Sequence, residues 1–196
     1  MSLKAIRYGL WAAIAALSLL LAVLYFLPRD NGLGEVVKLG APFSLIDQDG
    51  NPITEKAFEG HPTVLFFGFT HCPEVCPTSL YELSGMIDKL GEEGKDLRAF
   101  FITVDPERDT PEIMKGYTTA FTDRITGITG DPAEVEKLVA GWRVYAKKVP
   151  LEGDDYTMDH TASIFLVDRE GRFKGTIDYE ENPDTGFAKL KRLIAG

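Results

Sequence analysis

Cysteine, histidine and basic side chains are all scarce in this sequence of 196 residues. Two cysteines are too few for a disulfide-rich scaffold or for a zinc site built from four thiolates. With 21 basic against 30 acidic residues the net charge is −9, which excludes a nucleic-acid binder that relies on a basic surface. The composition, 44% hydrophobic and 26% charged, is typical of one globular domain. Any chemistry of the cysteines therefore comes from a single pair.

The N-terminal segment contains no acidic residue, and the stretch 8–27 contains no charge at all. Its twenty residues match the length of helix that crosses a hydrocarbon core of about 30 Å. No small-residue cleavage site lies near its end, so the pattern favours an uncleaved anchor over a signal peptide. Two basic residues precede the stretch, which places the N-terminus in the cytoplasm. We therefore predict a single transmembrane helix at 1–27 in the bacterial inner membrane, a linker at 28–38, and a domain at 39–196 that faces the periplasm.

The rest of the chain alternates between apolar runs and segments of helical periodicity. After a short hairpin within 43–53, the patterns predict strands at 63–69, 97–104 and 125–129, helices at 78–90, 109–121 and 131–145, a hairpin at 162–177 and a last helix at 182–195. This order predicts an α/β sandwich with a mixed sheet. Domains of this kind bind ligands beyond the carboxyl ends of their parallel strands. The segment 70–77, which contains both cysteines, lies at that position.

The cysteine pair occupies the sequence Thr-His-Cys-Pro-Glu-Val-Cys-Pro, with the thiols at Cys72 and Cys76. In a continuous helix these residues would share one face, with Cβ atoms about 5–6 Å apart. Free backbone N–H groups at a helix start favour negative charge and would lower the pKa of Cys72. Pro77 opposes a helical conformation at the preceding residue and predicts an irregular first turn. Two adjacent thiolates suit either a soft metal ion or a disulfide.

A metal ion would need a third ligand, and the sequence offers three histidines. His61 lies in a polar turn and is predicted to be exposed, and His71 is predicted to point away from the neighbouring thiol. His160 stands immediately before an apolar strand, where a structural hydrogen-bonding role competes with a role as a metal ligand. Met158 is a weaker soft donor, and Asp159 is a candidate for orienting the imidazole of His160. From the residues alone both roles of His160 stay open.

Four motifs in order make the chain similar to a known family. They are F-G-F-T-H-C-P-E-V-C-P-T-S-L at 67–80, T-V-D-P-E-R-D-T-P-E at 103–112, I-T-G at 128–130 and D-H-T at 159–161. In these motifs the chain resembles the SCO/SenC copper chaperones, which act in cytochrome c oxidase assembly. The resemblance covers essentially all of residues 36–196.

The resemblance implies a thioredoxin-like fold with an N-terminal β-hairpin extension. It also implies one copper ion per domain, as Cu(I) with Cu(II) left open, bound by Cys72, Cys76 and His160. The implied function is that of a membrane-anchored metallochaperone, not an enzyme, that delivers copper to the binuclear site of cytochrome c oxidase. An accessory reduction of that site's cysteines is left open. The implied partners are the oxidase subunit that carries this copper, a copper donor protein and a thioredoxin-like reductant.

Two other functions compete with this interpretation. One is a metal-free thiol–disulfide oxidoreductase that acts on extracytoplasmic cysteine pairs through Cys72 and Cys76. Against it, the Pro-x-x-x-Thr/Ser-x-x-Cys pattern of peroxidases with this fold precedes neither cysteine, and His160 stands where thioredoxins keep a cis-proline. The other is a redox-inert domain with a structural disulfide, which is disfavoured because so small a loop adds little stability.

Overall fold

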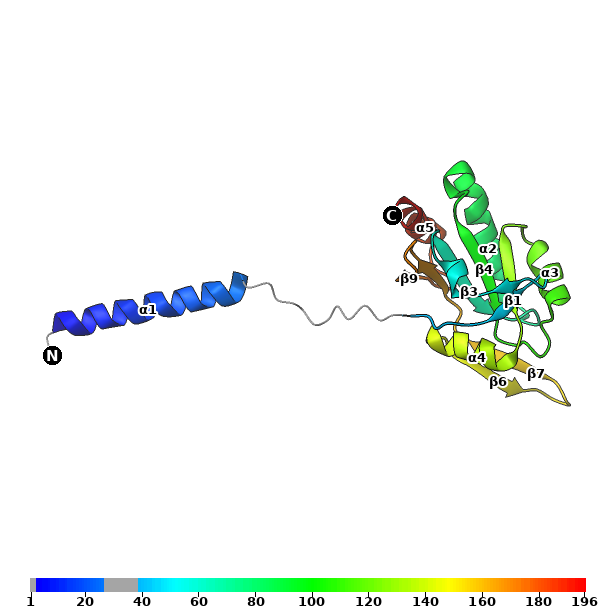
Figure 1. Cartoon of the computed structure of the whole chain (residues 1–196), viewed down its shortest axis with the longest axis horizontal. Coiled ribbons are helices and arrows are strands. Elements are labelled where there is room, and N and C mark those ends of the chain that lie inside the picture. The colour runs from blue at the N-terminus through cyan, green and yellow to red at the C-terminus, as the bar shows by residue number, and fades with distance from the viewer. Residues whose placement is uncertain (1–2, 27–38) are drawn as a thin grey trace. The chain divides into compact units, whose positions relative to one another are not determined.

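The computed structural model describes residues 3–26 and 39–196, which form two separate units (Figure 1). The first unit contains the helix α1 (Leu3–Phe26). The second unit contains all the other helices and strands that the structure describes. The linker predicted at 28–38 lies outside the described residues.

The structure does not support the transmembrane anchor predicted at 1–27. A span needs about 20 predominantly apolar residues in one helix. Among the described residues, no helix combines the length and the apolar character that crossing a membrane requires. The prediction of a single-pass inner-membrane protein is therefore wrong.

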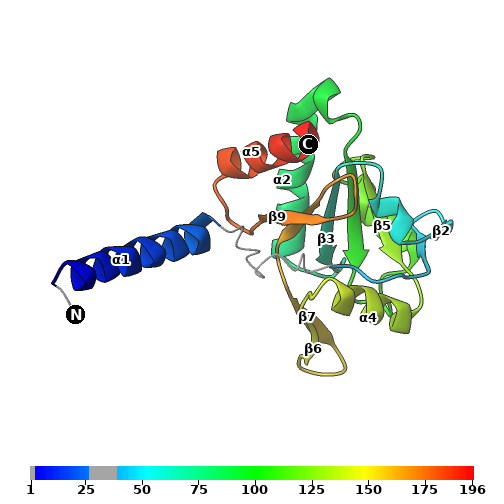
Figure 2. The same cartoon turned by 60° about the vertical axis from the view of Figure 1, so that its left-hand side comes forward.

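A seven-stranded mixed sheet, in the order β2-β1-β5-β4-β3-β8-β9, forms the centre of the second unit (Figures 1 and 2). The three central strands β3, β4 and β5 are parallel, and the remaining pairs are antiparallel. The strands are β1 (Leu45–Asp47), β2 (Pro52–Ile53), β3 (Thr63–Gly68), β4 (Arg98–Thr103), β5 (Ile125–Thr129), β8 (Ile164–Val167) and β9 (Phe173–Ile177). The predicted α/β architecture with a mixed sheet is confirmed.

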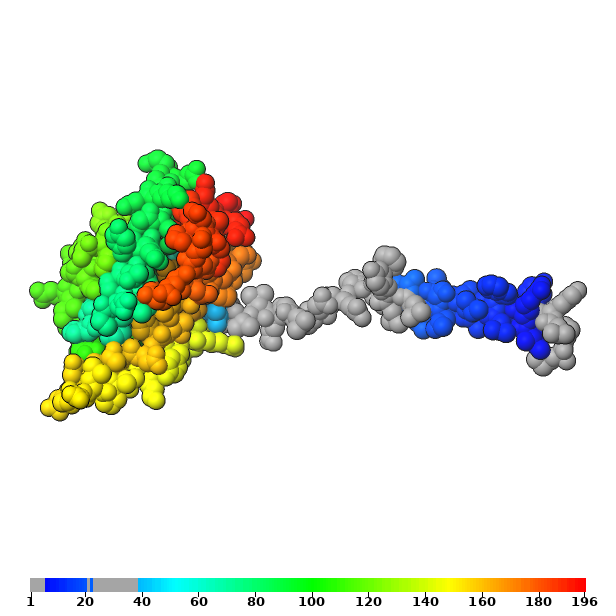
Figure 3. Space-filling model, turned by 180° about the vertical axis from the view of Figure 1, so that it is seen from behind, coloured from blue at the N-terminus to red at the C-terminus, as the bar shows by residue number. Residues whose placement is uncertain are grey.

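Helices cover this sheet, and three of them start in the way their sequences predict. The helices are α2 (Val75–Leu90), α3 (Pro111–Thr119), α4 (Pro132–Gly141) and α5 (Pro183–Ala195), with short 3-10 helices at Glu55–Phe58 and Gly91–Gly94. α3, α4 and α5 each begin with proline, preceded by a residue whose side chain accepts a backbone N–H. Figure 3 shows α5 lying beside α2, and contacts between the two helices agree with this view.

A second, two-stranded sheet was not predicted. It consists of β6 (Ala146–Pro150) and β7 (Tyr156–His160), which pair only with each other. The predicted helix at 131–145 ends instead at Gly141, before this hairpin starts. The strands were missed because their side chains are partly or fully exposed and form no apolar run. The hairpin projects from the lower edge of the domain in Figure 1.

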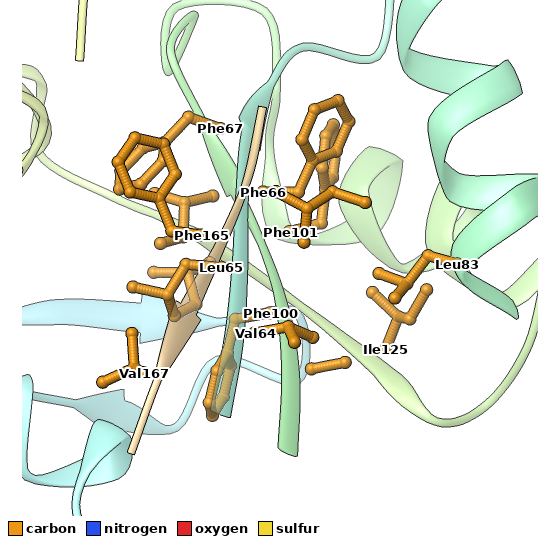
Figure 4. Packing of buried hydrophobic residues seen from close by; sticks show 14 of the residues in the cluster. Val64, Leu65, Phe66, Phe67, Leu83, Phe100, Phe101, Ile125, Phe165 and Val167 are labelled. Atoms are coloured by element: carbon orange, nitrogen blue, oxygen red, sulfur yellow. The ribbon is translucent and has the colours of Figure 1, made fainter. Parts of the chain in front are cut away.

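The hydrophobic core surrounds β3, as its unbroken apolar sequence predicts. Every residue of this strand is buried. Phe66 and Phe67 point to opposite faces of the sheet, the first toward Phe101 and the second toward Phe165 (Figure 4). This packing fixes the end of β3, from which the cysteine-containing segment continues.

Candidate metal centre

The two cysteines lie where β3 leads into α2. Cys72 belongs to the connecting loop, and its N–H donates to the Phe69 carbonyl at 3.3 Å. α2 starts at Val75, so Cys76 is its second residue. The irregular first turn predicted from Pro77 is not present: Cys76 is helical, and the proline occupies the third helical position, where no N–H is needed within the helix. Only one of the two thiols therefore belongs to the helix.

The imidazole of His160 reaches the cysteines from β7, of which it is the last residue. Its Nε2 lies 3.4 Å from Sγ of Cys76, and its Nδ1 lies 2.9 Å from the carbonyl oxygen of Thr161. Because a carbonyl can only accept, Nδ1 carries the proton and Nε2 of the neutral ring has a free lone pair. The rings of Phe66 and Phe69 pack edge-on against the imidazole. Backbone and packing thus aim Nε2 at the thiols.

The structure brings together the three residues that the resemblance implied as ligands. The Sγ atoms of Cys72 and Cys76 and the nearest nitrogen of His160 all lie within 4.8 Å of one another. Three ligands at metal-ligand bond lengths in a trigonal arrangement would stand about 3.7–4.0 Å apart. A metal ion therefore needs only a small contraction of the group. Cys76 is buried, whereas the other two residues are half-buried.

The two thiols have opposite pKa shifts. The pKa of Cys72 lies well below its usual value, chiefly because the Cys76 thiol donates a hydrogen bond to it, and the N–H of Cys76 adds to this. That N–H lies 3.3 Å from Sγ of Cys72. The pKa of Cys76 is raised by the same hydrogen bond and by burial. The reduced pair therefore holds one thiolate and one shared proton, and a metal bound to both sulfurs must displace that proton.

The other histidines lie outside this group. His71 is exposed, and its Nδ1 contacts the Thr70 hydroxyl at 3.2 Å instead of a sulfur. Nδ1 of His61 contacts Asp96 at 2.6 Å on the surface of the domain. These placements agree with the sequence predictions.

The predicted role of Asp159 is wrong. Its carboxylate is exposed, and the acceptor that orients His160 is the carbonyl of Thr161. The strand pairing explains this, because adjacent side chains of β7 point to opposite faces. Met158, the weaker soft donor, packs against the hydrophobic core and lines a cavity beside β6.

Sequence reasoning missed two residues that shape the site. The carboxylate of Asp109 is fully buried and accepts from the N–H and hydroxyl of Thr70 and from the hydroxyl of Thr103. It thereby holds the loop that carries Cys72. The cap of α3 is the next residue, Thr110. Gly68 is the second residue: a Cβ there would lie 2.8 Å from Sγ of Cys76.

The fold and the site together define a class of protein. A cysteine pair after the parallel strand β3, facing a histidine from a later segment, makes this a thioredoxin-like α/β domain with a soft metal-ligand set. The chain belongs to the SCO1/SenC family, whose family model matches residues 32–195. The family resemblance noted in the sequence is confirmed.

Individual relatives agree with this assignment. The chain is 43% identical over 136 residues to protein SCO1 homolog 1, mitochondrial, of Arabidopsis thaliana, covering 69% of this chain but only 41% of that relative's length. A solved structure, that of Bradyrhizobium japonicum ScoI with copper bound, is 50% identical, with a TM-score of 0.74 over 79% of this chain and 99% of its own. A structure of BsSco, described by its disulfide switch and as a member of the Sco family of cytochrome c oxidase assembly proteins, is 26% identical, with a TM-score of 0.65 over 80% of this chain and 93% of its own.

Proposed function

We propose that this chain is a copper metallochaperone that binds one copper ion through Cys72, Cys76 and His160 and passes it to the binuclear copper site of cytochrome c oxidase. The observation that carries the proposal is the convergence of two thiols and one imidazole nitrogen from distant chain segments within 4.8 Å. Two sulfurs and one nitrogen form a soft set of three ligands, which suits Cu(I). The copper-bound relative, 50% identical, supports the choice of metal.

The exposure of the site supports exchange of the metal with a partner. Cys72 and His160 are half-buried, so ligands of another protein can approach the metal from their side. The low pKa of Cys72 keeps one thiolate ready for metal capture at neutral pH. We further propose that a copper donor protein loads the site, and that a thioredoxin-like reductant keeps the pair reduced, because a disulfide would remove two ligands.

Copper titration of the reduced full-length chain tests this function. With a Cu(I)-specific chelator as competitor, we expect about one Cu(I) per chain and X-ray absorption that shows two sulfurs and one nitrogen. H160A should weaken binding at least tenfold, because loss of the imidazole leaves two thiolates. H61A is the matched control, because His61 lies on the surface beside Asp96. Unchanged affinity in H160A would remove the imidazole from the site.

A second candidate function is a metal-free thiol–disulfide reductase. The lowered pKa of Cys72 beside a protonated Cys76 favours it, because this is the arrangement of an attacking and a resolving thiol. C72S and C76S should then abolish reduction of a model disulfide, whereas H160A should leave it intact. Equal loss in all three variants would favour the copper function.

A further inference from the structure

The position of His160 depends on how the β6–β7 hairpin is held against the rest of the domain. The hairpin forms its own two-stranded sheet and shares no strand pairing with the main sheet (Figure 2). Both cysteines, in contrast, are fixed by the β3–α2 segment. His160 is tied to the main sheet by the short connection to β8 and by packing against Phe66 and Phe69. Side-chain contacts between the rest of the hairpin and the body add to these restraints on the distance between imidazole and thiols.

The richest of these contacts join the hairpin to the turn Asp105–Asp109, called the 105–109 turn below. The guanidinium of Arg108 donates from Nε to the Asp105 carboxylate and from Nη1 to the Tyr156 carbonyl at 2.9 Å. It also lies over the Tyr156 ring, 3.7 Å from the ring centre. Tyr156 is the first residue of β7, so Arg108 binds the strand whose last residue is His160.

Further contacts close the network. The Tyr156 hydroxyl donates to Asp105 at 2.7 Å, so one carboxylate receives both Arg108 and Tyr156. This carboxylate is almost fully buried, with 3% exposure. Nζ of Lys148 on β6 contacts Glu107 at 2.7 Å and lies 3.8 Å from the centre of the Tyr156 ring. Both strands of the hairpin are thus attached to this turn.

The same turn also holds the cysteine loop. At its far end, Asp109 accepts the N–H and hydroxyl of Thr70, two residues before Cys72. Five consecutive residues therefore fix both halves of the ligand set: Asp109 holds the thiol side, and Asp105 with Arg108 holds the imidazole side. Arg108 contacts none of the three ligands.

We propose that Arg108 is a positioning residue, which sets the distance of His160 from the two thiols and thereby the affinity for the metal. This inference rests on the proposed copper function. Arginine is needed because two of its nitrogens bridge a carboxylate and a carbonyl while its plane stacks on an aromatic ring. A lysine supplies a point charge that cannot make both hydrogen bonds and the stacking contact together. Without the bridge the hairpin can take a wider range of positions, so the arrangement that brings His160 close to both thiols is populated less.

The test compares R108Q and R108K with the wild-type full-length chain, using Cu(I) affinity and X-ray absorption as readouts. We expect Cu(I) binding to weaken about tenfold in R108Q, as for other residues that orient a metal ligand. The nitrogen contribution should weaken or disappear from the absorption spectrum, whereas both sulfurs remain. R108K should show the same effect in smaller measure. R172Q is the matched control, because Arg172 is an exposed arginine paired with Asp168 on the β8–β9 turn.

A double-mutant comparison separates positioning from general stability. In an H160A background no imidazole remains to be positioned, so adding R108Q should leave Cu(I) affinity unchanged. A tenfold loss in that background as well, or wild-type affinity and a full nitrogen signal in R108Q alone, would overturn the proposal. If the proposed copper function itself is wrong, the result differs, because H160A alone would then leave Cu(I) affinity unchanged.

A milder variant covers the case in which R108Q does not fold. Y156F removes only the hydroxyl that binds Asp105 and keeps the ring under the guanidinium. We expect about a threefold loss of Cu(I) affinity, about the value of one hydrogen bond, which disappears in the H160A background. If Y156F folds and keeps wild-type Cu(I) affinity while R108Q does not fold, the contacts of Arg108 and Tyr156 only stabilise the fold. This result would refute the positioning role.

Discussion

Replacement of Gly68 by alanine tests whether the end of β3 and the metal centre share one packed space. A Cβ at this position would lie 2.8 Å from Sγ of Cys76 and 2.7 Å from a ring carbon of Phe101. Contacts in a packed core are about 3.5–4.0 Å, so the thiol and the ring would each have to move by about 1 Å. Neither has free room, because both side chains are completely buried.

The size of the effect follows from this crowding. An extra methyl group in a well-packed core typically costs about 1–3 kcal/mol. In a domain of this size each kcal/mol lowers the melting temperature by about 2–4 °C, so G68A should unfold about 2–12 °C below the wild type. Cu(I) affinity should fall as well, because the displaced atom is one of the proposed ligands.

Thermal unfolding of the reduced, metal-free chain and a Cu(I) competition titration measure the two effects. G85A is the matched control: Gly85 is exposed on α2, and a Cβ there meets no atom within 4 Å. This control should be more stable by about 0.8–1.0 kcal/mol, because alanine favours a helix, and its copper affinity should not change. A G68A variant with wild-type melting temperature and affinity would refute the crowding argument.

Two further predictions concern the loop and its thiols. D109N should unfold at lower temperature and bind Cu(I) more weakly. In this variant an amide nitrogen replaces one of the oxygens that accept hydrogen bonds from Thr70 and Thr103. A folded D109N with unchanged Cu(I) affinity would contradict the role of Asp109 in holding the loop. The pKa of Cys72 is lowered, so its thiolate is present above that reduced pKa and absent below it. Iodoacetamide at pH 6 should therefore modify Cys72 and spare Cys76, and C76A should move the Cys72 reaction to higher pH because the main hydrogen-bond donor is gone. Mass spectrometry measures the rate at which each cysteine is alkylated. Equal rates for Cys72 and Cys76 at pH 6 would disprove this assignment.

Most elements of the main sheet could be predicted because their sequences carry strong local signals. The strand Ile125–Thr129 lies where it was predicted, and Asp131 and Asn182, the first residues of two predicted helices, act as helix caps before proline. Packing and capping act between near neighbours in the chain, so they leave a pattern that can be identified. The predicted membrane anchor at 1–27 shows the limit of a composition argument, since no described helix meets the requirement for a span.

The site was harder to predict because it is assembled from distant segments. Periodicity placed His160 at the edge of a strand but gave no reason to bring it to Cys76, 84 residues away in sequence. Only the resemblance of the motifs to a known family implied that His160 lies close to Cys76. The β6–β7 hairpin escaped detection because polar residues such as Lys147 and Lys148 hide its alternation. The one local signal for this hairpin is the turn sequence of Gly153 and the two aspartates that follow it.

Under the proposed function, the unequal burial of the two sulfurs would give the transfer of copper an order. Cys76 is completely buried, whereas Cys72 and the imidazole are open to an approaching protein. A recipient could therefore replace only the bonds to Cys72 and His160 at first, and the bond to Cys76 would be the last to break. Under the proposed function, C72S would remove one of the two metal bonds that a recipient replaces first. C76S would remove the bond that retains the ion until the recipient has bound it.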